Sequence, residues 1–195
     1  QVHNPANAGN DSSPSVLCPF YMSEDDGMKL TASVRRLTPD DWSQFRRVRL
    51  QALSTDPHVF SSNHSRESAW PAIVWQHRLS NPEVAVFGVF FEERMVGMTG
   101  IAVDREDATR ALLWGTWLHP SVRGRQFSDA IYAVRIGWAV DRPELTHIDV
   151  SHRATNAPSR AAILKHGFHQ VGTETRIWGD GTDDEAWIYE LILPR

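Results

Sequence analysis

Apolar positions along the chain fall into runs that are typical of buried strands. Residues 84–91 and 95–103 are largely apolar and are separated only by Glu92-Glu93-Arg94, so they are predicted to form a hairpin. Residues 110–118 are predicted to continue this antiparallel meander. Further strands are predicted at residues 33–37, 146–151, 169–178 and 185–193. A sheet is therefore the main element of the predicted fold.

Segments with helical spacing lie between these strands. Thr38 is predicted to cap a helix on which apolar residues recur from Trp42 to Ala52, and Asp56-Pro57 is predicted to end it. Further helices are predicted at 71–79, from Phe127 to Trp138, and at 157–166. The predicted order is β-α-α-β-β-β-α-β-α-β-β.

Composition is that of a globular protein and argues against several classes of function. The 195 residues, 41% hydrophobic and 23% charged, predict one domain with a sizeable core. A formal net charge of −4 gives no general attraction to nucleic acid. No run reaches the roughly 18 apolar residues of a membrane span. The one cysteine, Cys18, excludes an intrachain disulfide and any multi-cysteine zinc site, and no other metal-ligand spacing is present.

The start of the chain differs from the rest. Residues 1–15 are rich in Asn, Ala, Gly, Ser and Pro and contain little that could be buried. We therefore expect residues 1–30 to be a flexible or non-native extension and residues 31–195 to be the folded domain. A cytoplasmic location is expected from the single cysteine.

A basic loop between a predicted strand and a predicted helix is the first candidate site. A strand that turns into a helix aims unpaired backbone N–H groups and the positive end of the helix dipole at one point, which favours phosphate. The candidate residues are Arg123, Gly124, Arg125, Gln126, Phe127 and Ser128. Gln126 is expected to adopt a helical conformation and point outward, and Ser128 can donate its hydroxyl to a phosphate oxygen. The alternative is a surface turn that only caps the helix.

A second block follows about forty residues later. It runs from Asn156 through Ser159 and Lys165 to Gly167-Phe168, and it predicts a short helix that ends at a glycine and enters a strand. In their order and separation the two blocks resemble the GCN5-related N-acetyltransferase (GNAT) superfamily. The resemblance implies an α+β fold with a mixed, mostly antiparallel central sheet flanked by helices. It also implies acetyl-CoA as cosubstrate and an amine as acceptor.

The resemblance assigns roles to individual positions. Asn156 and Ser159 match residues that lie along the pantetheine arm of CoA in a subgroup that acetylates ribosomal-protein N-termini, and a plain helix cap is the alternative for Asn156. The thioester oxygen needs a donor, and a backbone N–H near Trp117 or Leu118 is expected to supply it. Segment 48–62 resembles a second acetyltransferase subgroup and is expected to cover the acceptor side.

The sequence offers several candidates for the groups that transfer protons. Many family members place a tyrosine acid where Ile163 stands, so that acid is absent. Asp149 is the candidate base, with His119 and His147 as alternatives. The other interpretation of Asp149 is an ion pair with a nearby Arg or Lys.

Two function classes follow from these observations. The first is an acetyl-CoA-dependent N-acetyltransferase that modifies a primary amine of a small molecule or peptide by direct attack. The alternative is a non-catalytic acyl-CoA-binding regulatory module on the same fold, motivated by Ile163 and Gln126. No nucleic-acid or membrane partner is expected, and a homodimer is possible because exposed strand edges can pair.

Overall fold

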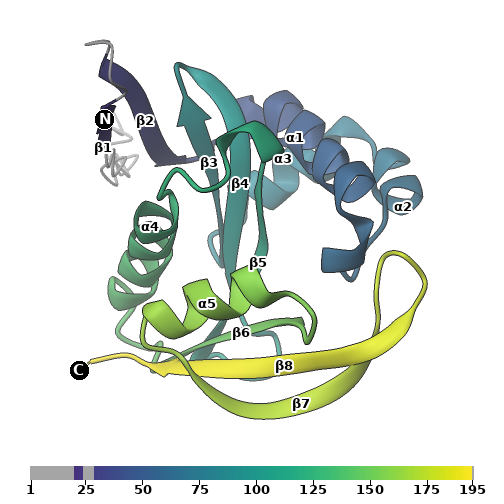
Figure 1. Cartoon of the computed structure of the whole chain (residues 1–195), viewed down its shortest axis with the longest axis vertical. Coiled ribbons are helices and arrows are strands. Elements are labelled where there is room, and N and C mark those ends of the chain that lie inside the picture. The colour runs from purple at the N-terminus through teal and green to yellow at the C-terminus, as the bar shows by residue number, and fades with distance from the viewer. Residues whose placement is uncertain (1–19, 24–28, 195) are drawn as a thin grey trace, which may run out of the picture.

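A mixed, mostly antiparallel sheet forms the centre of the computed structural model, which describes residues 20–23 and 29–194 (Figure 1). Its strands are β1 (Phe20–Ser23), β2 (Lys29–Arg36), β3 (Val84–Phe91), β4 (Arg94–Val103), β5 (Arg110–Leu118), β6 (His147–Arg153), β7 (His169–Ile177) and β8 (Asp183–Ile192). They lie in the order β1-β2-β3-β4-β5-β6-β8-β7, and among these pairs only β5 and β6 are parallel. The predicted architecture is confirmed, and the predicted elements occur in the predicted order; strand β1 was not predicted.

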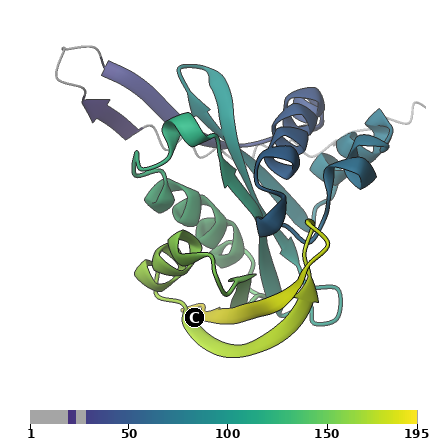
Figure 2. The same cartoon turned by 45° about the vertical axis from the view of Figure 1, so that its right-hand side comes forward.

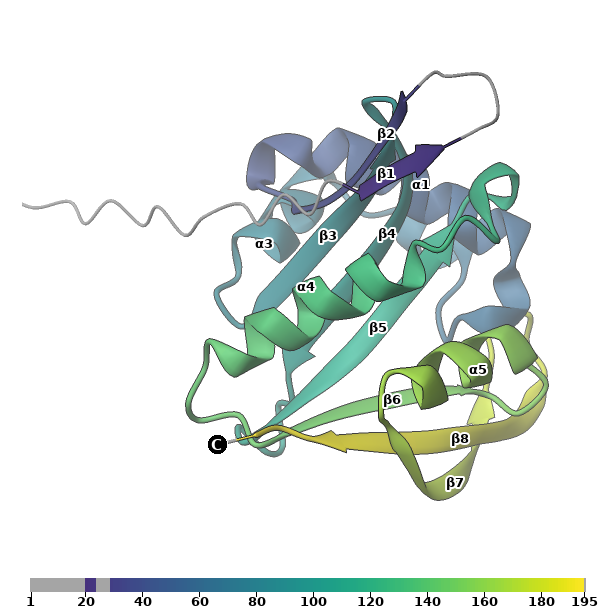
Figure 3. The ribbon, with the colours of Figure 1, turned by 60° about the vertical axis from the view of Figure 1, so that its left-hand side comes forward.

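Helices cover both faces of this sheet. The longer ones are α1 (Trp42–Thr55), α3 (Ala72–Ser80), α4 (Ser128–Val140) and α5 (Ala157–Lys165). Helices α4 and α5 lie on one face, and α1 and α3 lie on the other (Figure 3). The sequence did not predict the five-residue helix α2 (His64–Ser68), which is too short to show an apolar period. It is capped by Asn63, whose side chain accepts a hydrogen bond from the Arg66 N–H. Three single 3₁₀ turns complete the described helices: η1 (Pro39–Asp41), η2 (Pro57–Val59) and η3 (Pro120–Val122).

Each layer of helices has its own apolar core. The predicted face of α4 is buried, because Phe127, Ile131 and Trp138 pack with strand residues beneath α4 and α5. On the opposite face, Phe45 of α1 and Trp75 of α3 are fully buried and meet edge to face at 5.4 Å. These two cores fix the helices to the sheet and so hold in place the helix ends and loops near its middle.

The sheet opens between β5 and β6. Their parallel pairing covers only three residues of β5 and ends at Leu112↔Asp149. Beyond it β5 contains a bulge, where the register with β4 shifts and Gly115 has a φ of 67°. A bulge bends a strand, and the positive φ at this point favours glycine. The bulge therefore lies where β5 diverges from β6. The final residues of β5 therefore lack a β6 partner.

The expected N-terminal extension falls largely on residues 1–19 and 24–28, which lie outside the described residues. Residues 20–23 form β1, which pairs antiparallel with β2 at the edge of the sheet. Within the described ranges, no helix is long and apolar enough to cross a membrane.

Candidate functional site

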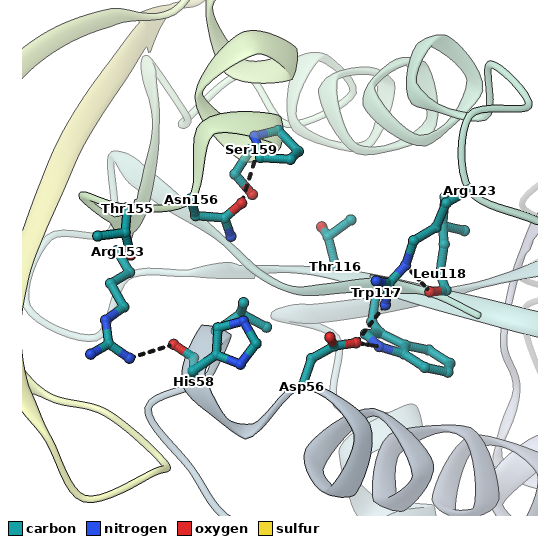
Figure 4. A pocket seen from close by; sticks show the side chains of 12 residues that line it. Asp56, His58, Thr116, Trp117, Leu118, Arg123, Arg153, Thr155, Asn156 and Ser159 are labelled. Atoms are coloured by element: carbon teal, nitrogen blue, oxygen red, sulfur yellow. Dashed lines mark hydrogen bonds and ion pairs between the residues drawn. The ribbon is translucent and has the colours of Figure 1, made fainter. Parts of the chain in front are cut away.

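A pocket of about 510 Å³ lies where β5 and β6 separate (Figure 4). It is bounded by β5, by the first turn of α5 and by the segment after α1. The lining residues are Asp56, His58, Val59, Thr116, Trp117, Leu118, Arg123, Arg153, Thr155, Asn156, Pro158 and Ser159. Its lining residues come from α5 on one face of the sheet and from the segment after α1 on the other. The two turned views show these elements on opposite faces (Figures 2 and 3).

Five of the site residues predicted from the sequence meet in this pocket. They are Trp117, Leu118, Arg123, Asn156 and Ser159. They come from two segments about forty residues apart, and the geometry of the open sheet brings them together. The structure thus places both sequence blocks around one cavity.

Asn156 combines the two roles that the sequence left open. Its side-chain oxygen accepts a hydrogen bond from the Ser159 N–H at 3.2 Å, so it caps α5. It also lines the pocket, with Ser159 beside it on the same turn (Figure 4). The cap orients the first turn of α5, which borders the cavity.

The loop before α4 has an unusual backbone. Gly124 has a φ of 79° and Gln126 has a φ of 59°. The prediction that Gln126 is helical is therefore wrong, because its backbone lies in the left-handed region. Its side chain is exposed, as predicted. Such a conformation costs a non-glycine residue roughly 1–2 kcal/mol. The two left-handed residues turn the chain sharply enough for α4 to begin at Ser128.

The remaining residues of this loop lie outside the pocket. Phe127 is 1% exposed and anchors the start of α4 in the core. The Ser128 hydroxyl is buried and has no hydrogen-bond partner among the described residues, so it retains a donor and an acceptor at the helix N-terminus. The Arg125 guanidinium lies 5.1 Å from the centre of the Phe91 ring and lines a second hollow. Binding of a phosphate by this loop stays a prediction.

The sequence placed Arg123 in a candidate phosphate-binding loop, but in the structure its side chain contacts other residues of the pocket. Its Nε donates to the Leu118 carbonyl at 2.9 Å, and its Nη2 donates to the Asp56 carboxylate. Trp117 Nε1 donates to the same carboxylate oxygen at 2.7 Å. Arg123 therefore ties the end of β5 to the end of α1 across one wall of the pocket (Figure 4).

These contacts determine the charge of Asp56. Burial by itself raises the pKa of this carboxyl group, but the hydrogen bonds from Trp117 and Arg123 and the positive charge of Arg123 outweigh it. The pKa of Asp56 therefore lies below its ordinary value. Asp56 is therefore ionised at neutral pH, and its carboxylate, paired with Arg123, lies on the α1 side of the pocket.

The hydrogen bond from Arg123 also distinguishes between the two predicted backbone donors. The N–H and C=O of one strand residue point to the same side of the strand. Because the Leu118 carbonyl points to Arg123, away from β4, the Leu118 N–H also points away from β4. By the alternation of the ladder, the peptide edge of Trp117, which pairs with Met98, faces β4. The Leu118 N–H is therefore better placed than the Trp117 N–H to donate to a group in the pocket.

The structure does not bring the candidate bases to the pocket. Asp149 accepts two hydrogen bonds from Arg110, at 2.7 and 2.6 Å, and Glu190 shares the same guanidinium. This is the ion pair that the sequence offered as the other interpretation. His119 contacts the Ser121 hydroxyl and His147 contacts the Thr146 hydroxyl, and neither lines the pocket. Catalysis by Asp149 stays a prediction.

The sequence did not indicate the individual residues that line the pocket on its α1 side. Asp56 and His58 line the pocket from the segment after α1. Arg153 donates to the His58 carbonyl at 3.2 Å and to Asp180 at 2.7 Å, so it links this segment to the β7–β8 turn. The signal that could have found them was the Asp-Pro-His sequence at 56–58, within the segment expected to cover the acceptor side.

A family model described as "Acetyltransferase (GNAT) domain" matches residues 33–169. The chain belongs to the GNAT acetyltransferase family. A search of curated proteins finds no match for it. The matched range contains all the residues of β5, the 123–128 loop and α5, so the pocket lies within the family's domain.

Solved structures show the same GNAT fold at low sequence identity. RimJ from Mycobacterium smegmatis, in complex with CoA-disulfide, is 21% identical with a TM-score of 0.67, over 85% of each chain. A Salmonella typhimurium acetyltransferase that modifies the N-terminal serine of ribosomal protein L7/L12 is 15% identical with a TM-score of 0.66, over 84% of this chain and 95% of that one. A GNAT-family acetyltransferase from Streptococcus pneumoniae is 16% identical with a TM-score of 0.69, over 84% and 99%.

Proposed function

We propose that this GNAT protein is an acetyl-CoA-dependent N-acetyltransferase that transfers acetyl to a primary amine by direct attack in a ternary complex. The observation that carries the proposal is the pocket at the opening between β5 and β6. It combines the β5 edge near Leu118 with the first turn of α5 in a single cavity. This arrangement provides room for an extended acyl-carrying arm between two surfaces that offer backbone and side-chain donors.

The donors on the α4–α5 side fit acyl-CoA. The arm would lie between β5 and Asn156 and Ser159, and the thioester oxygen would accept a hydrogen bond from the Leu118 N–H. The pyrophosphate would lie at the start of α4, where the Ser128 hydroxyl lacks a partner and the helix dipole is positive. Gly124 and Arg125 flank this point.

The α1 side fits an amine. The Asp56 carboxylate supplies a negative charge that attracts a protonated amine, and the His58 side chain projects into the pocket (Figure 4). An amine with a pKa near 10.4 is mostly protonated at neutral pH and must lose a proton before attack. We propose His58 as the group that accepts it, with Asp149 as the alternative. Two facts favour His58: it lines the pocket, and Asp149 is held by Arg110.

The class of acceptor comes from relatives. The Salmonella acetyltransferase acts on the N-terminal serine of a ribosomal protein. We therefore propose a peptide or protein N-terminus as the first acceptor class to test, with small-molecule amines as the second. Both present a primary amine to the side of the pocket that contains Asp56 and His58.

Two observations favour a second candidate function, a non-catalytic acyl-CoA-binding module. Ile163 occupies the position of the usual tyrosine acid and is buried. The backbone of Gln126 is left-handed, at a position where the family's loop usually has glycine. A thiol of pKa near 8.5 leaves without obligatory protonation, so neither observation excludes turnover.

The test is acetyl transfer followed by mass spectrometry of a panel of N-terminal peptides and small amines, with release of the CoA thiol measured in parallel. Variants His58→Gln and Asp149→Asn separate the two candidate bases. We expect His58→Gln to lower kcat by about 100-fold and Asp149→Asn to leave kcat largely intact. Binding of acetyl-CoA without transfer to any amine would support the non-catalytic module instead.

A further inference from the structure

Helix α4 places a charged side chain inside the apolar core. Arg135 is 1% exposed, and no carboxylate among the described residues forms an ion pair with it. Its Nε donates to the Ile131 carbonyl at 3.1 Å, and the guanidinium carbon lies 4.4 Å from the centre of the Tyr132 ring. Its Nη1 donates to the Thr116 hydroxyl at 3.0 Å, and its Nη2 has no hydrogen-bond partner in the part of the chain that the structure describes.

This arginine remains positively charged despite its burial. Desolvation lowers the pKa of Arg135 to about 10, and the nearby Tyr132 partly opposes that shift. A cation buried without an anion costs more free energy than a neutral side chain of similar size. The other buried arginine of the core layers, Arg49, has its cost offset by two hydrogen bonds to Glu67. Arg135 has no such partner, so its position calls for another explanation.

Thr116 connects this charge to the pocket. It lies next to the bulge at Gly115, lines the pocket and projects from β5 on the side of α4 and α5 (Figure 4). A guanidinium only donates, so the Thr116 oxygen must accept from Arg135. The same oxygen is 2.7 Å from the Thr99 hydroxyl. Either hydroxyl can be the donor in this pair. If Thr99 donates, both lone pairs of Thr116 are used, and its own O–H is available to donate to a group in the pocket that Thr116 lines.

We propose that Arg135 is a positioning residue for acyl transfer: it orients the Thr116 hydroxyl toward the acyl-CoA sulfur and places a fixed positive charge behind it. The inference rests on the proposed function, because it needs an acyl-CoA arm between β5 and α5. It adds a source of leaving-group stabilisation to a site in which Ile163 replaces the usual acid.

The transfer step shows where this stabilisation acts. The amine nitrogen forms a bond to the acyl carbon, and its proton passes to the base. The carbon–sulfur bond breaks, and its electron pair stays on the sulfur, which leaves as the CoA thiolate. A negative charge therefore develops on the sulfur next to the Thr116 hydroxyl, with the Arg135 cation one hydrogen bond further away. The thiolate later takes a proton from solvent.

The experiment measures the thiol pKa of CoA bound to the full-length protein. CoA carrying a carbon-13 label next to the sulfur is titrated with pH by NMR, free and at saturation. In the unmodified protein the bound thiol pKa should be about one unit below that of free CoA. Arg135→Met and Thr116→Val should each reduce this shift, and Arg135→Lys should retain much of it. Arg142→Met removes a charge just beyond the same helix, over Trp138, and should leave the shift unchanged.

Each outcome has a distinct meaning. Failure of the unmodified protein to bind CoA contradicts the proposed function. Normal CoA binding with a thiol pKa equal to that of free CoA, or with a shift that survives both Arg135→Met and Thr116→Val, overturns the role of Arg135. If Arg135→Met does not fold, Thr116→Val decides the question, because it removes one hydroxyl and keeps the buried charge. In folded variants kcat should fall about tenfold while the KM for acetyl-CoA changes little, a split that a packing role alone would not produce.

Discussion

The Asp56 carboxylate allows a quantitative test of how the pocket wall is held together. One of its oxygens accepts hydrogen bonds from Trp117 Nε1 and from Arg123. Asp56→Asn keeps an acceptor oxygen in that place and removes the charge, whereas Asp56→Ala removes the acceptor as well. Comparison of the two variants therefore separates the effect of charge from the effect of the hydrogen bond.

The magnitudes follow from the burial of the two donors. The Trp117 side chain is buried, so changing its acceptor from charged to neutral costs about 1 kcal/mol. The Arg123 side chain is 46% exposed, and solvent screening limits its ion pair to less than about 1 kcal/mol. Asp56→Asn should thus lower the free energy of unfolding by about 1–2 kcal/mol. Asp56→Ala leaves the buried indole N–H unpaired and should cost about 3 kcal/mol.

Urea unfolding followed by tryptophan fluorescence measures both values. Asp40→Asn serves as the control, because Asp40 is an exposed acid near the start of α1 and should change stability by less than about 0.5 kcal/mol. The reasoning is refuted if the alanine variant is no less stable than the asparagine variant, or if both match the control.

The same pair predicts a dependence on pH. The pKa of Asp56 is lower in the folded protein than its ordinary value near 3.9, so its contribution to stability is complete above about pH 4. It is lost as the pH falls through the folded pKa. The difference in unfolding free energy between the unmodified protein and Asp56→Asn should therefore narrow below about pH 4 and stay constant between pH 5 and pH 8.

Three further predictions concern other parts of the molecule. Gln126→Gly should stabilise the protein by about 0.5 kcal/mol in urea unfolding, because relief of the left-handed conformation exceeds the added chain entropy, and Gln126→Ala should not. Glu67→Gln should destabilise by about 3–5 kcal/mol, since it leaves the buried Arg49 without its anion, and Arg49→Met in the same chain should restore part of that loss. Asn156→Ala should cost about 1 kcal/mol of stability and raise the KM for acetyl-CoA, whereas a normal KM would reduce Asn156 to a cap.

The elements that the sequence predicted are those with strong local signals. The hairpin at 84–103, the apolar face from Phe127 to Trp138 and the glycine after α5 each depend on neighbouring residues, and the structure confirms them. Helix α2 was missed because five residues are too few to show a period. It is tied to α1 by the long-range contact of Glu67 with Arg49, which is not visible in the local sequence.

For the site, too, the sequence predicted the residues with local signals and missed those that depend on long-range contacts. The N-cap pattern identified Asn156, and the strand-to-helix turn identified the 123–128 loop, because both are local signals. The partner of Arg123 lies 67 residues earlier in the chain, at Asp56, and the Arg135–Thr116 contact spans two elements. Such pairings depend on how the helices pack on the sheet, so they could be found only once the fold was known.

The backbone of the 123–128 loop shows a further limit of prediction from the sequence. Gln126 was expected to be helical because a residue with a side chain is disfavoured in the unusual backbone conformations that glycine can adopt. The turn into α4 requires a left-handed residue at that point, and tertiary contacts of Phe127 in the core enforce it. Packing of the next residue thus overrides the local preference of Gln126.

The most direct test of the account is a crystal structure of the protein with CoA. We predict that the pantetheine arm lies between β5 and the first turn of α5, with its amide groups near Leu118 and Asn156. The pyrophosphate should lie at the 123–128 loop, within hydrogen-bond distance of the Ser128 hydroxyl. CoA bound elsewhere on the molecule, with the pocket between β5 and α5 unchanged and empty, would contradict the central claim.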